Sequence, residues 1–187
     1  MKGWQQATTM AVMAGSMVLA ACGDSSTEPG GESEVISRVT LTLTPASGGA
    51  ALTTYIDDAD GKGPQAPSAQ VGALALARGV TYAGTVKFEN RLKSPAEDIT
   101  TEVQAEANEH RVFYTVTGNG VTITTTDVDG QSRPLGLRFN AAVGSSATAG
   151  AMRVVLCHYD GVAKTAAATS CTSETDVDLS FTYTIAP

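Results

Sequence analysis

The sequence predicts a mainly β protein, a single antiparallel β-sandwich of the immunoglobulin-like kind with about nine strands and one short crossover helix. Three observations indicate this fold. Apolar and polar residues alternate with period 2 over most of the chain, as in strands with one buried face. Turns rich in glycine and asparagine, such as 47–49 and 118–120, separate these segments at short spacing. Threonine fills many polar positions and suits strands because it is β-branched. A closed barrel is the alternative.

The first 21 residues have the features of an export signal and are set apart from the fold. Lys2 is followed by an apolar stretch from Met10 to Ala21, which is shorter than the about 20 residues that a membrane-spanning helix needs. The run Leu19-Ala20-Ala21-Cys22 resembles the lipobox of bacterial lipoproteins. That resemblance implies cleavage before Cys22 and lipid on its sulfur, which would anchor the protein to its membrane. An ordinary secretory signal cut after Ala21 is the alternative.

Residues 22–33 contain no large apolar side chain and include two glutamates and an aspartate. Such a segment cannot bury enough surface to offset the entropy of ordering, so we expect a flexible acidic tether. The remaining residues, 34–187, are the expected β-sandwich domain. They number about 154, a usual size for one domain with its own core.

The mature chain is acidic. Loss of Lys2 with the signal leaves 11 lysines and arginines against 19 acidic residues, a formal charge of −8. An acidic surface repels nucleic acid and anionic lipid headgroups, so we exclude both as partners and expect the membrane to be reached only through lipid on Cys22.

The nine strands are expected where alternation is clearest. Val39, Leu41 and Leu43 alternate with threonines in the first strand, and the last strand is the most regular. In that strand Val177, Leu179, Phe181, Tyr183 and Ile185 should face inward, and Asp176, Asp178, Ser180, Thr182 and Thr184 should face solvent. The expected ranges are 34–44, 51–57, 69–76, 80–91, 111–117, 120–127, 134–142, 150–159 and 176–185.

One segment breaks the period of two. Ser94, Pro95 and Glu97 form a capping box with proline at the first helical position. Ile99, Val103 and Ala107 then recur at a spacing of four, which indicates one apolar stripe. We therefore expect a helix over about 95–108. Its C-terminal end carries Glu106 and Glu109, against the preference of the helix dipole.

Two cysteines remain beside Cys22, namely Cys157 and Cys171. An even pair in an exported protein predicts a disulfide, which would close a loop of about 15 residues. Two free thiols are the alternative.

Several stretches together resemble a known family. They are the lipobox and tether, 39–45, the loop 58–61, 94–99, 108–110 and 174–178. They resemble small bacterial lipoproteins of unknown function whose members often carry the label "type 1 periplasmic binding fold superfamily protein". The resemblance implies an envelope location but no known chemistry. The two-domain α/β fold that the label names needs many helices, and this chain offers one.

His110 and His158 are the only histidines and the main candidates for metal ligands. Each is in phase with the apolar residues of its strand, so both should lie at strand ends on the buried face. Imidazole binds zinc and copper, and Glu109 or Glu106 could add a carboxylate. Two buried, hydrogen-bonded histidines are the alternative. A ring separation within about 5 Å favours a metal, and one beyond about 10 Å excludes it.

Two acidic turns are weaker candidates, in this case for calcium. Asp58 and Asp60 in the first turn, and Asp127 and Asp129 in the second, offer closely spaced carboxylates. Neither continues to the distal glutamate of an EF-hand loop. Asp-Gly also makes ordinary hairpin turns, which is the alternative.

The sequence does not name an activity. It contains no nucleophile elbow, no phosphate-binding glycine loop and no His-Glu-x-x-His motif, so no enzyme is expected and a hydrolase is the least favoured class. The leading hypothesis is a membrane-anchored, non-enzymatic sandwich in the bacterial cell envelope that binds a protein or small molecule through loops 58–68, 143–150 and 160–175. The alternative is a periplasmic metal-binding protein that uses His110, His158 and nearby carboxylates. Gly23 after Cys22 favours the outer membrane over the inner.

Overall fold

The computed structural model describes Met1 and residues 34–186. The expected signal (1–21), lipidation site Cys22 and tether (22–33) therefore lie outside the described residues, apart from Met1. No helix of the described residues is long and apolar enough to cross a membrane.

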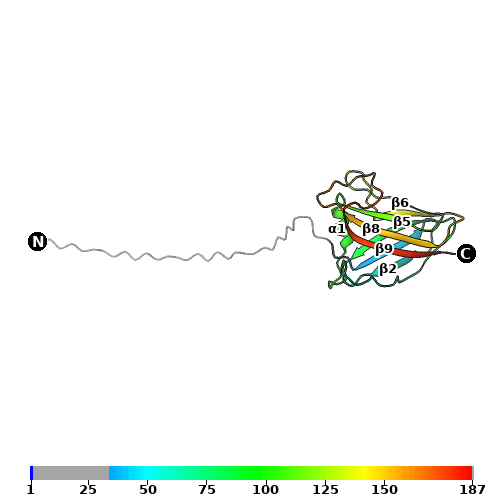
Figure 1. The fold of residues 1–187 in the computed structure, drawn as a ribbon, viewed down its shortest axis with the longest axis horizontal. Helices are drawn as coiled ribbons and strands as arrows, with labels where there is room; N and C mark the ends of the chain where they lie inside the picture. Colours follow the sequence, from blue (N-terminus) through cyan, green and yellow to red (C-terminus); the bar gives the residue numbers. More distant parts are fainter. Residues whose placement is uncertain (2–33, 187) are drawn as a thin grey trace.

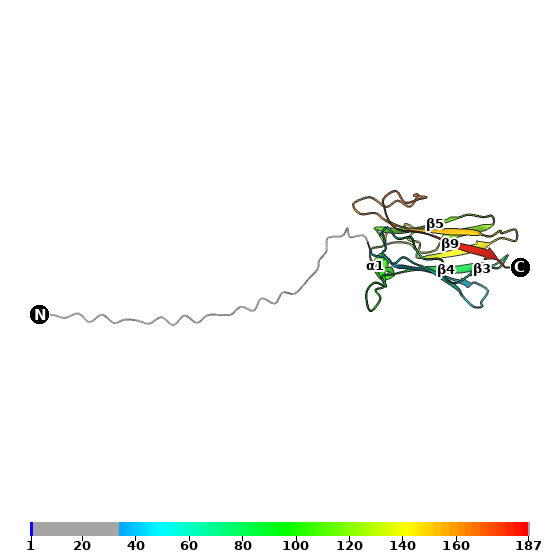
Figure 2. The same ribbon diagram turned by 60° about the horizontal axis from the view of Figure 1, so that its bottom comes forward.

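Two sheets pack face to face, which confirms the predicted β-sandwich (Figure 1, Figure 2). The strands of the described residues are β1 (Arg38–Pro45), β2 (Leu52–Asp57), β3 (Leu74–Leu76), β4 (Thr81–Glu89), β5 (His110–Val116), β6 (Val121–Thr125), β7 (Arg138–Val143), β8 (Gly150–His158) and β9 (Glu174–Ile185). One sheet has the order β2-β1-β4-β7-β6 and the other β3-β9-β8-β5. All pairs are antiparallel except β3–β9, which is parallel and corrects the purely antiparallel expectation.

The core lies between the two sheets and is made by the inward positions of the alternating strands. Phe181 and Tyr183 of β9 are buried, whereas the alternate residues Ser180 and Thr182 are exposed. This agrees with the predicted faces of the last strand. One position does not agree: Asp176, expected to face solvent, is buried.

The strand expected over 69–76 is shorter because the chain changes sheets within it. Val71 forms an isolated bridge with Tyr55 of β2, in the first sheet. Leu74 to Leu76 instead pair with Tyr183 to Ile185 of β9, in the second sheet. The chain from 71 to 74 thus crosses between the sheets, and crossing residues cannot extend either ladder.

The helix is also shorter than expected. Helix α1 spans Ile99–Ala105 and begins after Asp98, whose side chain accepts the backbone N–H of Thr100. The predicted capping box at Ser94 is wrong, because Glu97 forms a two-way backbone bridge with Asn90, just after β4, and is not available as a helical residue. The apolar stripe is confirmed, since Ile99, Val103 and Ala107 are buried against the core.

A second, smaller apolar cluster covers the outer face of the β5–β8 pair. It consists of Phe113, Val155, Cys157 and Tyr159, with Cys171 packed against it from the loop before β9. A disulfide joins Cys157 to Cys171, with the two Cα atoms 5.4 Å apart, and confirms the predicted pair. The loop 160–173 is thereby tied to the sheet.

We expect the double variant Cys157→Ala/Cys171→Ala to unfold more easily than the native chain, by about 3 kcal/mol on the chain-entropy model for a loop of this length. The bridged residues are 14 apart in sequence. Urea denaturation of both proteins measures the difference. The mass of the non-reduced native chain should be two hydrogens below that of the reduced one, and two titratable thiols per chain would contradict the bridge.

Candidate metal centre

The two histidines lie directly opposite each other in neighbouring strands. His110 opens β5, just after the turn that follows α1, and His158 closes β8. The two residues are register partners in the antiparallel β5–β8 pair, so their side chains emerge on the same face. Their rings stack with centroids 4.4 Å apart and planes 22° from parallel. This separation falls within the range that favours a shared metal ion.

A β-bulge brings the first carboxylate to this pair. Val177 of β9 pairs with Leu156, but Thr175 pairs with Cys157, which leaves Asp176 as the extra residue. A bulge interrupts the alternation of side chains and re-aims the residue it inserts. The side chain of Asp176 consequently turns inward and is fully buried. No residue type in the sequence marks this bulge, which is why the pattern of β9 placed Asp176 outside.

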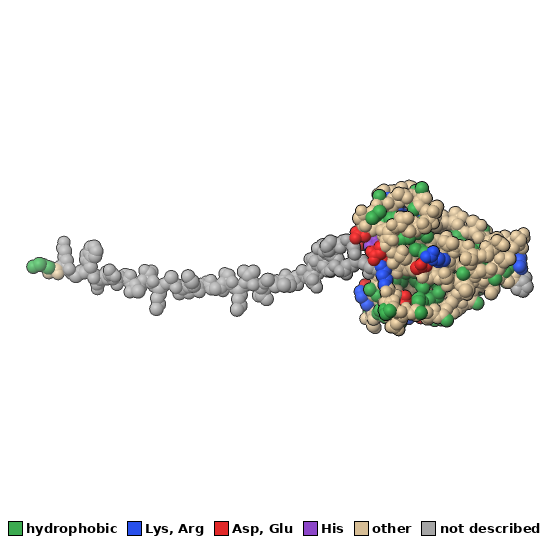
Figure 3. Space-filling model, in the orientation of Figure 1, with side chains coloured by type: hydrophobic (Ala, Val, Ile, Leu, Met, Phe, Trp, Pro, Cys, Tyr) green, Lys and Arg blue, Asp and Glu red, His purple; other side chains and the backbone are tan. Residues whose placement is uncertain are grey.

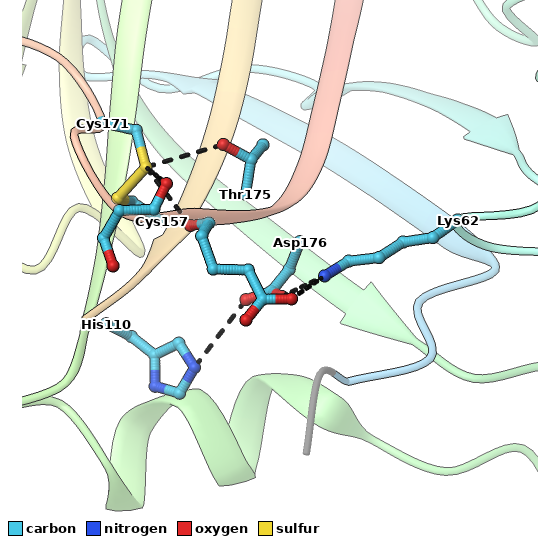
Figure 4. Close-up of a disulfide and its surroundings, with 8 residues drawn as sticks. Lys62, His110, Cys157, Cys171, Thr175 and Asp176 are labelled. Carbon is cyan, nitrogen blue, oxygen red and sulfur yellow. Dashed lines mark hydrogen bonds and ion pairs between the residues drawn. A yellow bond between two sulfur atoms is a disulfide. The ribbon is translucent and has the colours of Figure 1, made fainter. Parts of the chain in front are cut away.

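Glu34, at the start of the described domain, supplies the second carboxylate. Its Oε1 lies 3.1 Å from His110 Nε2. Asp176 Oδ2 lies 4.0 Å from the same nitrogen (Figure 4). The contact of Glu34 with His110 has an ion-pair distance but not hydrogen-bond geometry. The other oxygen of Glu34 is buried and receives no hydrogen bond from the described residues.

A backbone carbonyl orients the ring of His110. Nδ1 lies 3.3 Å from the carbonyl oxygen of Glu106, and because a carbonyl can only accept, Nδ1 carries a proton. Nε2 therefore points at Glu34 and Asp176. Burial lowers the pKa of His110, but the Glu34 carboxylate outweighs burial and holds that pKa above its ordinary value. Burial raises the pKa of Glu34, but His110 brings it below the usual value.

Lys62 and a cavity lie on the far side of Asp176. The ammonium of Lys62, from the β2–β3 loop, is 3.0 Å from Asp176 Oδ1 and 2.8 Å from Glu174 Oε1 (Figure 4). Burial keeps the pKa of Asp176 above its usual value despite this cation. Next to it opens a cavity of about 190 Å³. Its walls include Ile36, Val39, Asp58, Pro67, Val177 and Leu179.

A buried lysine fixes the backbone that carries His110. The ammonium of Lys164, from the loop after β8, donates to the carbonyls of Ala107 and His110 at 2.8 and 2.7 Å. It also lies 3.0 Å from Asp129 Oδ2, and both side chains are fully buried. All three ammonium donors thus have acceptors. The turn between α1 and β5 is held in place at the residue that supplies an imidazole.

Together Glu34, His110, His158 and Asp176 form one buried group. Each offers one ligand atom, and these atoms all lie within 4.8 Å of one another. Zinc bonds of about 2.0–2.2 Å in a tetrahedron place ligand atoms about 3.3–3.6 Å apart, so the group would contract by about 1 Å around an ion. Figure 3 shows histidine, acidic and basic side chains gathered at the end of the domain where the described chain begins.

Glu109, the predicted carboxylate ligand, is exposed and lies outside this group of described residues. Glu106 is closer, with Oε2 4.0 Å from His110 Nδ1, but its side chain is about half exposed. Proximity in sequence favoured these two residues, and the fold instead recruits Glu34 and Asp176 from distant segments.

The first acidic turn brings its two aspartates together. Burial, and then the neighbouring carboxyl of Asp60, raise the pKa of Asp58. Asp60 Oδ2 accepts the backbone N–H of Gln65, as a turn residue does. Calcium at Asp58 and Asp60 stays a prediction.

In the second acidic turn both carboxylates are engaged in hydrogen bonds or ion pairs with other residues of the domain. Asp127 accepts the backbone N–H groups of Gly136 and Arg138, and Asp129 is paired with Lys164 and Arg133. These contacts agree with the turn alternative and not with a calcium site.

No protein-family model, curated protein or solved structure matches this chain. The resemblance to small bacterial lipoproteins therefore stays an expectation, and the site has to be interpreted from its own chemistry.

Proposed function

We propose that this chain is a lipid-anchored protein of the bacterial cell envelope whose β-sandwich binds a divalent transition-metal ion, with zinc the ion that suits it best. One observation carries the proposal: two imidazoles and two carboxylates from four separate segments converge on one buried point. Neutral imidazole and carboxylate oxygen are the usual zinc ligands outside cysteine sites.

The alternative of two ordinary core histidines accounts less well for the polar atoms. Buried polar groups in proteins are nearly always hydrogen-bonded, because an unsatisfied one costs about 1–3 kcal/mol and a charged one more. Here His158 Nδ1 and Glu34 Oε2 are buried and receive no hydrogen bond from the described residues. A bound cation would satisfy the carboxylate and give the surrounding imidazoles a shared partner.

The ligand set favours zinc over other common ions. Calcium takes six to eight oxygens, and this group offers two carboxylates among four ligands. Soft ions such as Cu(I) prefer thiolates, and Cys157 and Cys171 are tied in the disulfide. Cu(II) and Ni(II) also accept imidazole and are expected to compete. Four protein ligands fill a tetrahedral shell, whereas catalytic zinc keeps one position open, so the set supports binding and not catalysis.

Exposed acidic residues near the group would attract cations. Glu106 and Glu174 have side chains about half exposed and lie beside His110 and Lys62, respectively. An acidic rim raises the local concentration of cations and their rate of association. Attraction of cations would account for the position of Glu106 at the C-terminal end of α1, which the helix dipole disfavours.

The test is zinc binding by the mature chain, residues 22–187, with Cys22→Ser to keep it in solution. After treatment with a chelator it should bind one zinc ion per chain in calorimetric titration. Zinc at about 100 times its Kd should raise the free energy of unfolding by about 2.7 kcal/mol. If the native chain bound zinc no more tightly than the Asp176→Asn variant does, the proposal would be refuted.

Two neighbouring aspartates of β9 give a matched pair of variants. Asp176→Asn should weaken zinc binding by more than about 10- to 100-fold. That range is the loss typical of mutating a residue that only hydrogen-bonds to a metal ligand, whereas Asp176 is proposed to bind the ion itself. Asp178→Asn should leave zinc binding unchanged, because Asp178 pairs with Arg153 on the outer face. Equal effects of the two changes would mean that the carboxylate of Asp176 does not contact the ion.

The hypothesis of a ligand or partner bound through loops stays open beside the metal. The β2–β3 loop contributes Lys62, which pairs with Asp176, and part of the wall of the cavity next to Asp176. A small molecule in this cavity would lie close to the metal centre, so the two hypotheses are compatible.

We expect Cys22→Ser to release the protein from the membrane, because lipid on Cys22 is the anchor that the sequence indicates. Fractionation of cells that express either form measures this. A processed variant that still sediments with membranes after a high-salt wash would contradict the lipoprotein assignment.

A further inference from the structure

Glu34 differs from the other three members of the buried group in the way its backbone is held. His110 and His158 are register partners in the β5–β8 ladder, and Asp176 lies between Thr175 and Val177, which both pair with β8. Glu34 precedes β1 in irregular chain. Among the described residues, backbone hydrogen bonds between this segment and the rest of the domain begin only at Ser37, which donates to the carbonyl of Glu89.

Glu34 also differs from the other members of the group in how deeply its side chain is buried. The side chains of His110 and Asp176 are fully buried, whereas that of Glu34 is 8% exposed. Val35, next in the chain, is about half exposed, and Ile36 is buried in the core. Glu34 is thus the member of the group that borders solvent, and the chain becomes fixed two residues after it.

The geometry points to Glu34 as the closing ligand of the metal centre: it moves aside to admit the ion and, once bound to it, fixes the start of the domain against β5 and β9. This inference rests on the proposed metal function. Its physical reason is that a ligand on an unladdered segment can leave at little cost, whereas ligands on paired strands cannot.

The consequence concerns the attachment of the domain. The chain before Glu34 leads to the lipid expected on Cys22. An extended residue spans up to about 3.3–3.6 Å, so freeing or fixing the segment before Ser37 shifts the point of attachment by up to roughly 10 Å. Metal occupancy would then change the position at which the expected tether joins the domain.

Hydrogen exchange of the mature Cys22→Ser chain, with and without saturating zinc, tests this. Zinc should slow amide exchange in a peptide covering 34–37 by at least about tenfold. Glu34→Gln, at zinc concentrations that saturate it, should lose this protection but keep that of β5. It should also release zinc to a chelator at least about tenfold faster. Glu109→Gln, an exposed glutamate outside the group, should behave as the native chain in both measurements.

The possible failures are distinguishable. If the native chain binds no zinc, the proposed function is wrong and the inference falls with it. If it binds zinc but exchange over 34–37 does not change, the metal centre stands and the role of Glu34 is refuted. Glu34→Asp keeps the charge but shortens the side chain by one methylene. It should restore part of the protection, whereas unchanged protection in Glu34→Gln would overturn the inference.

Discussion

Replacing Phe181 with alanine should lower the free energy of unfolding by about 3–5 kcal/mol, a large part of the about 5–15 kcal/mol typical of a whole domain. The ring is fully buried at the middle of β9, where it pairs with Met152 of β8 and faces the opposite sheet. Its removal would leave a cavity that two laddered sheets cannot readily close. Urea denaturation, with the slope m compared between proteins, measures the loss.

The control has to be an exposed position of the same strand. Ser180→Ala should cost well under about 1 kcal/mol, because only strand propensity is affected. Thr182→Ala should also be small, although its hydroxyl lies 3.0 Å from Gln70 Oε1 and adds one exposed hydrogen bond. Similar small losses for Phe181→Ala and Ser180→Ala would contradict the observed register of β9.

Asp129→Asn should destabilise the protein by a comparable amount, about 3–5 kcal/mol, since it leaves the ammonium of Lys164 buried without its counter-ion. Asp129 accepts the backbone N–H groups of Gln131 and Arg133, and its carboxylate contacts the side chains of Arg133 and Lys164. Asp160→Asn, in the exposed turn after β8, is the matched control and should change stability little.

The same carboxylate predicts a pH dependence. Burial alone would raise the pKa of Asp129, but the donors from Arg133, Lys164 and Gln131 outweigh burial and hold it well below the ordinary value. The carboxyl of Asp129 then binds a proton more readily in the unfolded chain than in the folded one. The contribution of Asp129 to the free energy of unfolding is therefore complete above about pH 5 and is lost as the pH falls below about 4.

Unfolding free energies measured from neutral to acid pH, with a chelator present, should therefore fall more steeply for the native chain than for Asp129→Asn. Parallel curves would show that Asp129 does not titrate as its contacts indicate. Since Lys164 also holds the carbonyl of His110, Asp129→Asn should weaken zinc binding as well, which links the ion pair to the metal centre.

Much of the fold could be predicted because its signals are local. The alternation around Leu41 and Phe181 depends only on which face of a strand is buried, and those faces agree with the structure. The inward direction of His110 and His158 followed from the same parity. The disulfide followed from counting cysteines in a chain that the sequence predicts to be exported. The error at Ser94 shows the limit of this reasoning, because a backbone bridge from Asn90 to Glu97 overrode the capping pattern.

What the sequence determined by itself is thus the set of strands, their buried faces, the disulfide and the candidate histidines. Only the tertiary structure decided that β5 pairs with β8 with His110 opposite His158, that a bulge turns Asp176 inward, and that Glu34 reaches the same point. The physical reason is that side-chain direction within a strand is set by its own backbone, whereas register and bulges depend on hydrogen bonds between strands that are distant in sequence.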